Sequence, residues 1–196
     1  MAYRLGGEII SADSRQVFRG MDIGTGKDLA DYDLHGTHIP YHIIDICEPG
    51  EEYSAYRFLR DFNDAYADII SRGRQPILCG GTGLYIDAVV RGYRLADAPV
   101  DEDYRRSLEA FSDEELTERL ASYIKLHNHT DTENRERLVR ALEIQEFSLA
   151  HPEACTQAPE MERFQAFILV VSVYICFGSA FCWIYAAVGD IESKFL

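Results

Sequence analysis

Apolar and polar positions change between strand-like and helix-like patterns along the first 90 residues. Short apolar runs over residues 8–11, over residues 41–46 and from Pro76 onward predict three buried strands. Between the second and third, Ser54 can cap a helix that Gly73 ends. Strand, helix and strand form the crossover unit of a parallel sheet, so the pattern predicts an α/β fold. The apolar helix positions are Phe58, Leu59, Phe62, Tyr66, Ile69 and Ile70.

The segment before the first strand resembles the end of a helix with a glycine cap. Residues 2–7 lead directly into the strand at Glu8. A helix this short is not stable alone, so we expect further helix, and a strand before it, to precede this segment.

From Asp97 the sequence becomes charged and helical. Helices are expected over residues 101–111, 112–123 and 132–149, with Ser112 and Glu115 as a capping box and Thr132 as an N-cap. A loop over 151–159 and an apolar strand over 164–173 follow. We therefore expect an α/β core over residues 1–95, a helical insertion over 96–158, a return strand within 159–173 and an apolar tail over 174–196.

Residues 164–188 carry no charge and are long enough to cross a bilayer. Three interpretations remain open: a membrane anchor, a buried strand followed by a core helix, or a tail that has departed from the sequence of its domain. Gly178 and Ser172 count against the anchor, as does the lack of a flanking Lys/Arg cluster.

Charge and cysteine content narrow the class of protein. The net charge of −14 does not favour general nucleic-acid binding, so such a role would depend on local clusters of Lys and Arg. The five cysteines are odd in number and never spaced CxxC, which predicts reduced thiols and a cytoplasmic protein. No histidine is assigned to a metal; Pro40 between His38 and His42 argues against a helical metal pair.

Short polar side chains follow two of the predicted strands, where parallel sheets collect ligands. Asp13 is equally compatible with a helix cap and with catalysis, and Thr82 with a tight turn. The residues concerned are Asp13, Ser14, Arg15 and Gln16 after the first strand, and Gly80, Gly81 and Thr82 after the third.

Four motifs in order resemble the tRNA dimethylallyltransferases, also called tRNA isopentenyltransferases. They are GEIISADSRQVFRGMDIGTGK, YHIIDICEPGEEYSAYRF, PILCGGTGLYIDAVV and RERLVRALEI, which begin at Gly7, Tyr41, Pro76 and Arg135. The resemblance spans about residues 1 to 173 and implies a P-loop-type parallel sheet flanked by helices.

The resemblance implies transfer of a dimethylallyl group from dimethylallyl diphosphate to N6 of an adenosine beside the anticodon. Asp13 matches the catalytic base, which takes a proton from a weakly nucleophilic amine. Thr82 matches a hydroxyl near the bridging oxygen, and Gly80 and Gly81 let the backbone approach the diphosphate. Mg²⁺ is the implied cofactor, and the implied state is a monomer.

The resemblance also implies contacts with the tRNA anticodon stem-loop. They involve the segment Asp13, Ser14, Arg15 and Gln16, the helix residues Glu136, Arg137, Leu138, Val139 and Arg140, and Arg105. From the residues alone, the arginines of this helix interleave with glutamates, so a solvated helix with internal ion pairs stays an alternative.

The chain also departs from the family pattern. The family's P-loop and first strand would precede this sequence, and Gly24 to Lys27 is no substitute because Met21 and Asp28 break the motif. We expect turnover by this chain to be feeble or nil, since the phosphate cradle supplies most of the leaving-group stabilisation. The alternatives are an ATP-binding nucleotide kinase on the same scaffold and a non-catalytic or tail-anchored relic.

Overall fold

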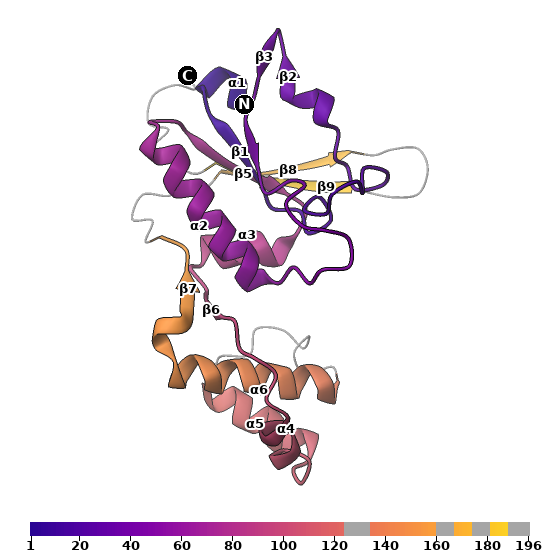
Figure 1. Cartoon of the computed structure of the whole chain (residues 1–196), viewed down its shortest axis with the longest axis vertical. Coiled ribbons are helices and arrows are strands. Elements are labelled where there is room, and N and C mark those ends of the chain that lie inside the picture. Colours follow the sequence, from indigo (N-terminus) through magenta and orange to yellow (C-terminus); the bar gives the residue numbers. More distant parts are fainter. Residues whose placement is uncertain (124–133, 160–166, 174–180, 188–196) are drawn as a thin grey trace. The chain divides into compact units, whose positions relative to one another are not determined.

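The computed structural model describes residues 1–123, 134–159, 167–173 and 181–187. The chain divides into two compact units (Figure 1). Unit 1 consists of residues 1–94 and 157–196, and unit 2 of residues 95–156.

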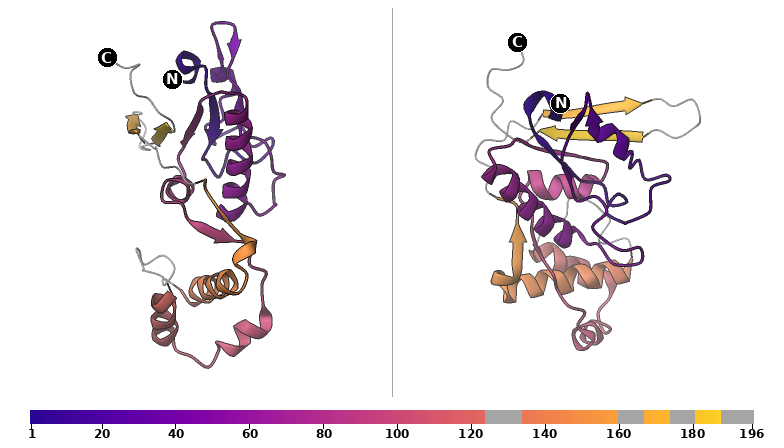
Figure 2. Two further views of the ribbon diagram at one scale, coloured as in Figure 1. Left: turned by 90° about the vertical axis from the view of Figure 1, so that its left-hand side faces the viewer. Right: turned by 45° about the horizontal axis from the view of Figure 1, so that its top comes forward.

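Unit 1 is built on a five-stranded sheet in the order β4-β1-β5-β9-β8. The last two strands of this order are the yellow arrows in Figure 2. β1 (Glu8–Ser11) lies between β4 (Tyr41–His42) and β5 (Pro76–Gly80) and is parallel to both, as the sequence predicted. β9 (Phe181–Ala187) runs antiparallel to β5 and to β8 (Phe167–Val173). A strand thus lies within the predicted return segment, and a second strand at residues 181–187 stands where one of the open interpretations placed a core helix.

Two helices cover one face of this sheet (Figure 1). α2 (Ala55–Ser71) begins where the Ser54 hydroxyl accepts a hydrogen bond from the Arg57 amide, and α3 (Gly83–Val90) follows β5. Most of the predicted apolar positions of α2 are buried, but Ile70 is 48% exposed. The short helix α1 (Ala2–Leu5) ends at Gly6, whose left-handed φ of 60° makes the expected glycine cap. The central core residues are Ile10, Phe58, Leu59, Phe62, Ile69 and Leu78.

The predicted strand over 41–46 is shorter than expected. Only residues 41–42 pair with β1, because Ile43 and Asp45 adopt left-handed backbone conformations with φ of 63° and 57°. Such conformations are costly for residues other than glycine and persist only where surrounding contacts impose them. A 3-10 turn (Leu29–Tyr32) and a small hairpin of β2 (Asp33–Leu34) and β3 (Thr37–His38) precede this strand.

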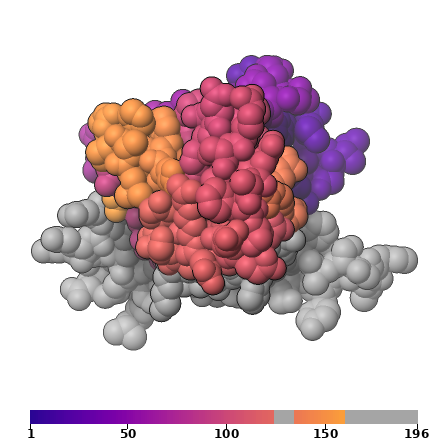
Figure 3. Space-filling model, turned by 90° about the horizontal axis from the view of Figure 1, so that it is seen from below, coloured from indigo at the N-terminus to yellow at the C-terminus, as the bar shows by residue number. Residues whose placement is uncertain are grey.

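Among its described residues, unit 2 has three α-helices, whose surface appears in pink to orange in Figure 3. They are α4 (Glu102–Ser107), α5 (Asp113–Tyr123) and α6 (Arg135–Ala150). The Ser112–Glu115 capping box is confirmed by its two reciprocal hydrogen bonds. Thr132 is not the N-cap of α6, because Asn134 caps it by accepting a hydrogen bond from the Arg137 amide. The core consists of Leu108, Leu116, Leu120, Leu138 and Leu142.

Short elements complete the described chain. β6 (Arg94–Ala96) and β7 (Cys155–Gln157) form a two-stranded sheet, and a 3-10 turn (Pro152–Ala154) precedes β7. Within the described ranges, no helix combines the length and the apolar character needed to cross a bilayer. Much of the predicted apolar tail, residues 174–180 and 188–196, lies outside the described residues.

Candidate active site

The two polar segments singled out in the sequence meet beside the carboxyl ends of β1 and β5. The Ser14 amide donates a hydrogen bond to the Thr82 hydroxyl oxygen at 2.9 Å, and that hydroxyl lies 3.2 Å from the Ser14 hydroxyl. The Thr82 amide in turn donates to the Ala12 carbonyl at 3.0 Å. The two Ser14–Thr82 contacts join residues 68 positions apart, and together with the Ala12 bond they bring Asp13 and Thr82 into one region of unit 1.

Gly80 makes this approach possible. A Cβ atom at Gly80 would lie 2.3 Å from the backbone of Ala12, closer than real Cβ contacts allow. Glycine is required here by space, because its φ is not left-handed. Gly80 thus sets how closely the ends of β1 and β5 pack.

Asp13 is buried, with an exposed fraction of 2%. One carboxylate oxygen accepts a hydrogen bond from the Arg15 amide at 2.9 Å, and the Arg15 guanidinium lies at longer distances of 3.4 and 3.5 Å from the two oxygens. Residues 14–17 form turns and no helix follows directly, so the alternative role of Asp13 as a helix cap does not apply. The charge of Asp13 adds to burial in raising the pKa of Tyr85 to about 12, which keeps that phenol protonated beside the carboxylate.

Gln16 points into the protein. Its side chain accepts a hydrogen bond from the Ser11 hydroxyl at 2.8 Å and donates to the Gly26 carbonyl at 3.1 Å, and the residue is 4% exposed. The backbone carbonyl of Gln16 accepts a hydrogen bond from the Asp45 amide at 3.1 Å. In this structure Gln16 therefore ties three loops together, and the RNA contact that the family resemblance implies for it stays a prediction.

Lys27 ends the Gly24 to Lys27 segment, which the sequence analysis compared with a P-loop, and its side chain is also buried inside unit 1. Its side chain has no exposed area, and its ammonium group donates to the Phe18 carbonyl at 2.7 Å and to Asp45 at 2.5 Å. A longer contact of 3.3 Å reaches Asp22. An ammonium group with three protein acceptors has no donor left for a phosphate, in agreement with the conclusion that this segment is not a P-loop.

The residues predicted to contact tRNA from unit 2 divide into three groups. Leu138 is 1% exposed and belongs to the helical core. Arg140 donates to the Ala98 carbonyl at 2.7 Å and pairs with Glu143, so much of its guanidinium holds the start of the unit. Arg105 of α4 and Glu136 and Val139 of α6 line an open pocket. Arg137 also lies on α6.

Glu143 is a site residue that the sequence prediction did not include. It is 4% exposed and accepts hydrogen bonds from Arg105, from Arg140 and from the Asp101 amide. Burial alone would raise its pKa, but the hydrogen bonds from Arg105, Asp101 and Arg140 outweigh burial and hold the pKa of Glu143 below its ordinary value. Its spacing of three from Arg140 was the one signal available in the sequence.

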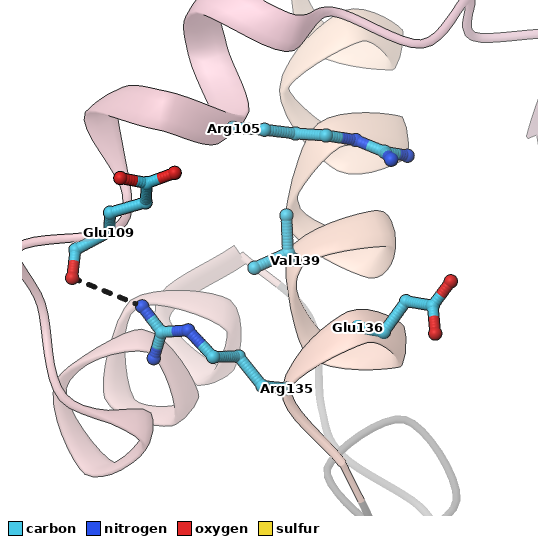
Figure 4. Close-up of a pocket in the computed structure, with 5 residues that line it drawn as sticks. All are labelled: Arg105, Glu109, Arg135, Glu136 and Val139. Carbon is cyan, nitrogen blue, oxygen red and sulfur yellow. Dashed lines mark hydrogen bonds between the residues drawn. The ribbon is translucent and has the colours of Figure 1, made fainter.

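The pocket lies beside α4 and α6 and has a volume of about 370 Å³ (Figure 4). Val139 supplies an apolar wall, and the remaining lining residues are charged. They are Arg105, Glu109, Arg135 and Glu136.

Comparison with known proteins assigns the chain to a family. The IPP transferase family model matches residues 16–174, and the chain belongs to this family. It is 53% identical to tRNA dimethylallyltransferase 1 of Porphyromonas gingivalis over 162 residues, which are 83% of this chain and 54% of that protein. It is 49% identical to tRNA dimethylallyltransferase 1 of Parabacteroides distasonis, over 89% of this chain and 55% of the relative. The chain thus spans about half the length of the curated relatives it matches.

A solved structure supports the fold. A eukaryotic dimethylallyltransferase acting on tRNA matches 80% of this chain and 41% of its own, with a TM-score of 0.55 and 22% sequence identity. This likeness confirms the α/β architecture expected from the sequence.

Proposed function

We propose that this chain carries the acceptor-activating part of a cytoplasmic tRNA dimethylallyltransferase, acting on the adenosine beside the anticodon. The observation that supports this most directly is the hydrogen bond from the Ser14 amide to the Thr82 hydroxyl, next in sequence to Asp13, within a chain that belongs to the family. The donor would be dimethylallyl diphosphate, and the acceptor the exocyclic N6 of adenine.

Asp13 is the proposed general base. The lone pair of an adenine amine is drawn into its ring, so a carboxylate that takes the proton during attack on the allylic carbon lowers the barrier. In the structure the Arg15 guanidinium, 52% exposed, lies against this carboxylate at long hydrogen-bond distances. An RNA phosphate that attracts Arg15 would free Asp13 for the incoming base.

Thr82 is proposed to face the diphosphate. The hydroxyl stands at the start of α3, where the first backbone amides of a helix lack intrahelical acceptors and favour anions. Gly80 and Gly81 keep side chains away from this edge. Together the hydroxyl and the amides would stabilise charge on the leaving group.

The side chains of this region fit Mg²⁺ as partial ligands. Asp13, Ser14 and Thr82 present only oxygen donors, which Mg²⁺ prefers, and Mg²⁺ commonly completes its shell with phosphate oxygens and water. When bound, the ion would neutralise part of the diphosphate charge. Within the described residues, no cluster of three or more His, Cys, Asp or Glu side chains could hold a metal without such help.

The test is to incubate the chain with dimethylallyl diphosphate, Mg²⁺ and unmodified tRNA, and to measure prenylated adenosine by mass spectrometry. We expect slow product formation that falls by at least about 100-fold in Asp13→Asn. The matched control is Asp28→Asn, because Asp28 is an exposed carboxylate whose side chain makes no capping bond.

Product that forms equally well in the Asp13→Asn variant would overturn the assignment of the base. The absence of both product and RNA binding by the unaltered chain would overturn the proposed function as a whole. A rate close to that of a full-length relative would contradict the expectation of feeble turnover.

A further inference from the structure

An isoleucine at the tip of a loop in unit 1 lies fully in solvent. Ile23 is 100% exposed, more than any other large apolar residue among those that the structure describes. Met21, two positions earlier, is 45% exposed. Single apolar side chains are common on protein surfaces, so exposure alone assigns no role to Ile23. Its role follows from how the loop is held and from which segment lies beside it.

The loop that carries Ile23 is fixed from within. The hydroxyl of the buried Thr25 donates a hydrogen bond to the Met21 carbonyl at 2.7 Å. The buried Lys27 ammonium lies 3.3 Å from the Asp22 carboxylate. The residues on both sides of Ile23 are therefore tied to the interior, while Ile23 itself buries none of its surface.

The end of this loop is bonded to the segment that carries the proposed general base. The Gln16 side-chain amide donates to the Gly26 carbonyl at 3.1 Å and lies 3.4 Å from the Thr25 carbonyl. The backbone amide of Gln16 donates to the Asp13 carbonyl at 3.2 Å. Ile23 precedes Gly26 by three residues, which span at most about 10 Å of extended chain. Ile23 therefore stands within reach of nucleotides that adjoin a base bound at Asp13.

Extrusion of the target adenine leaves a gap in the stack of an RNA loop. Enzymes that act on a base take it out of the stack and must meet the cost of unstacking it. Proteins that unstack bases commonly insert an apolar side chain, such as isoleucine, leucine, methionine or phenylalanine, between them. Such a contact needs no charge, which suits a loop whose only lysine is buried and bonded to protein acceptors.

We propose that Ile23 is a wedge that enters the anticodon-loop stack beside the extruded adenosine and packs against the flanking base. Because the loop is already held by its own hydrogen bonds, little ordering is required when RNA binds. Ile23 is a positioning residue, since it acts on the target adenosine through the neighbouring base. This role rests on the proposed function and deepens it.

The first test measures extrusion directly. An anticodon stem-loop RNA carries 2-aminopurine in place of the target adenosine; this base has no N6 amino group to react, and its fluorescence rises when it leaves the stack. At saturating protein, Ile23→Ala should reduce the fluorescence rise by about half or more and weaken binding about tenfold, because the apolar contact is lost. Ile23→Leu keeps the apolar bulk and should restore both.

Leu34→Ala is the matched control. Leu34 is a 41% exposed apolar residue on the β2–β3 hairpin of the same unit, and its loss should leave both RNA affinity and fluorescence unchanged. Since Ile23 buries no surface, Ile23→Ala should not shift the midpoint of thermal unfolding, so weaker binding would not reflect misfolding. Equal effects of the two substitutions on the RNA would overturn the proposal.

A second test identifies the base that the wedge meets. Abasic nucleotides replace the two nucleotides that flank the target, one at a time, and each RNA is titrated with the unaltered chain and with Ile23→Ala. Two groups in contact show non-additive effects, so at one flanking position the loss of the base should remove the effect of Ile23→Ala. Additive effects at both positions would overturn the wedge.

A second copy of this chain is the other occupant that an exposed isoleucine can meet. Sedimentation over a range of protein concentrations, with and without Ile23→Ala, detects it. Self-association that Ile23→Ala abolishes, together with RNA binding that it leaves intact, would overturn the wedge. If the unaltered chain binds no stem-loop RNA, the proposed function itself fails. If it binds the RNA and raises the fluorescence, but Ile23→Ala behaves as Leu34→Ala does, only the wedge fails.

Discussion

The hydroxyl group of Thr82 accepts a hydrogen bond from the backbone amide of Ser14 at 2.9 Å. Thr82 occupies the N-cap position of α3, but its side chain makes no capping hydrogen bond to that helix. The hydroxyl therefore connects the segment after β1 to the segment after β5. A threonine that looked like an ordinary turn residue fixes the relative positions of the two proposed functional segments.

Removing this acceptor is expected to destabilise unit 1. Thr82→Val keeps the shape of the side chain but leaves the partly buried Ser14 amide without its acceptor, at an expected cost of about 1–2 kcal/mol in the free energy of unfolding. Thr82→Ser keeps the hydroxyl and serves as the control. Urea unfolding of the two variants measures the difference, and equal stabilities would show that the hydrogen bond contributes nothing.

Gly80 and Gly83 offer a matched pair for backbone packing. Gly80→Ala would place a methyl group 2.3 Å from the Ala12 backbone, and we expect a loss of at least about 3 kcal/mol or failure to fold. A methyl group at Gly83 meets nothing within 4 Å, so Gly83→Ala should leave stability unchanged or raise it by up to about 1 kcal/mol. Similar midpoints of thermal unfolding for the two variants would contradict this account.

Glu8 predicts how stability depends on pH. Bidentate hydrogen bonding from Arg72, which outweighs burial and is assisted by His42, lowers the pKa of Glu8 from 4.5 to about 2. Because the folded-state pKa lies below the unfolded one, the stabilisation is complete above about pH 5 and is lost as the pH falls towards 2. The shift corresponds to about 3 kcal/mol.

The variant Glu8→Gln should therefore be less stable than the unaltered chain at pH 7, and the gap should close as the pH falls through this range. Chemical unfolding at several pH values measures the gap. A difference that stays constant from pH 7 to pH 3 would exclude titration of Glu8 as its cause.

The buried ammonium of Lys27 predicts a large effect from a single substitution. Lys27→Met leaves the Phe18 carbonyl and Asp45 without their donor, with an expected loss of about 3 kcal/mol. Arg91→Met is the control, because Arg91 and Asp87 form an ion pair in which both side chains are exposed and which contributes about 0.5 kcal/mol or less. Unfolding curves of equal midpoint would mean that burial of Lys27 adds no stability.

Features governed by local sequence were predictable. The glycine cap at Gly6, the Ser54 cap and the Ser112–Glu115 box each depend on residues within a few positions of one another, and all three are present. The parallel order of β1, β4 and β5 followed from the strand–helix–strand pattern.

Features governed by distant contacts were not predictable. No residue near Ile43 in the sequence predicts its left-handed backbone conformation. The segment is held by hydrogen bonds from the Asp45 and Ile46 amides to the backbone carbonyls of Gln16 and Val17, far earlier in the chain. The partner of Arg105 was likewise hidden, because Glu143 lies 38 positions away. The motifs located the candidate segments, but only the fold shows which of their side chains, such as Gln16 and Leu138, face inward.

The antiparallel strand β9 has a practical consequence for anyone who shortens this protein. Since β9 is hydrogen-bonded to β5 on one side and to β8 on the other, cutting the chain after Val173 would delete an interior strand and not a loose end. The backbone groups along β5 would then lose their partners and become an open edge, which invites association with other chains. Expression boundaries placed there should yield aggregates.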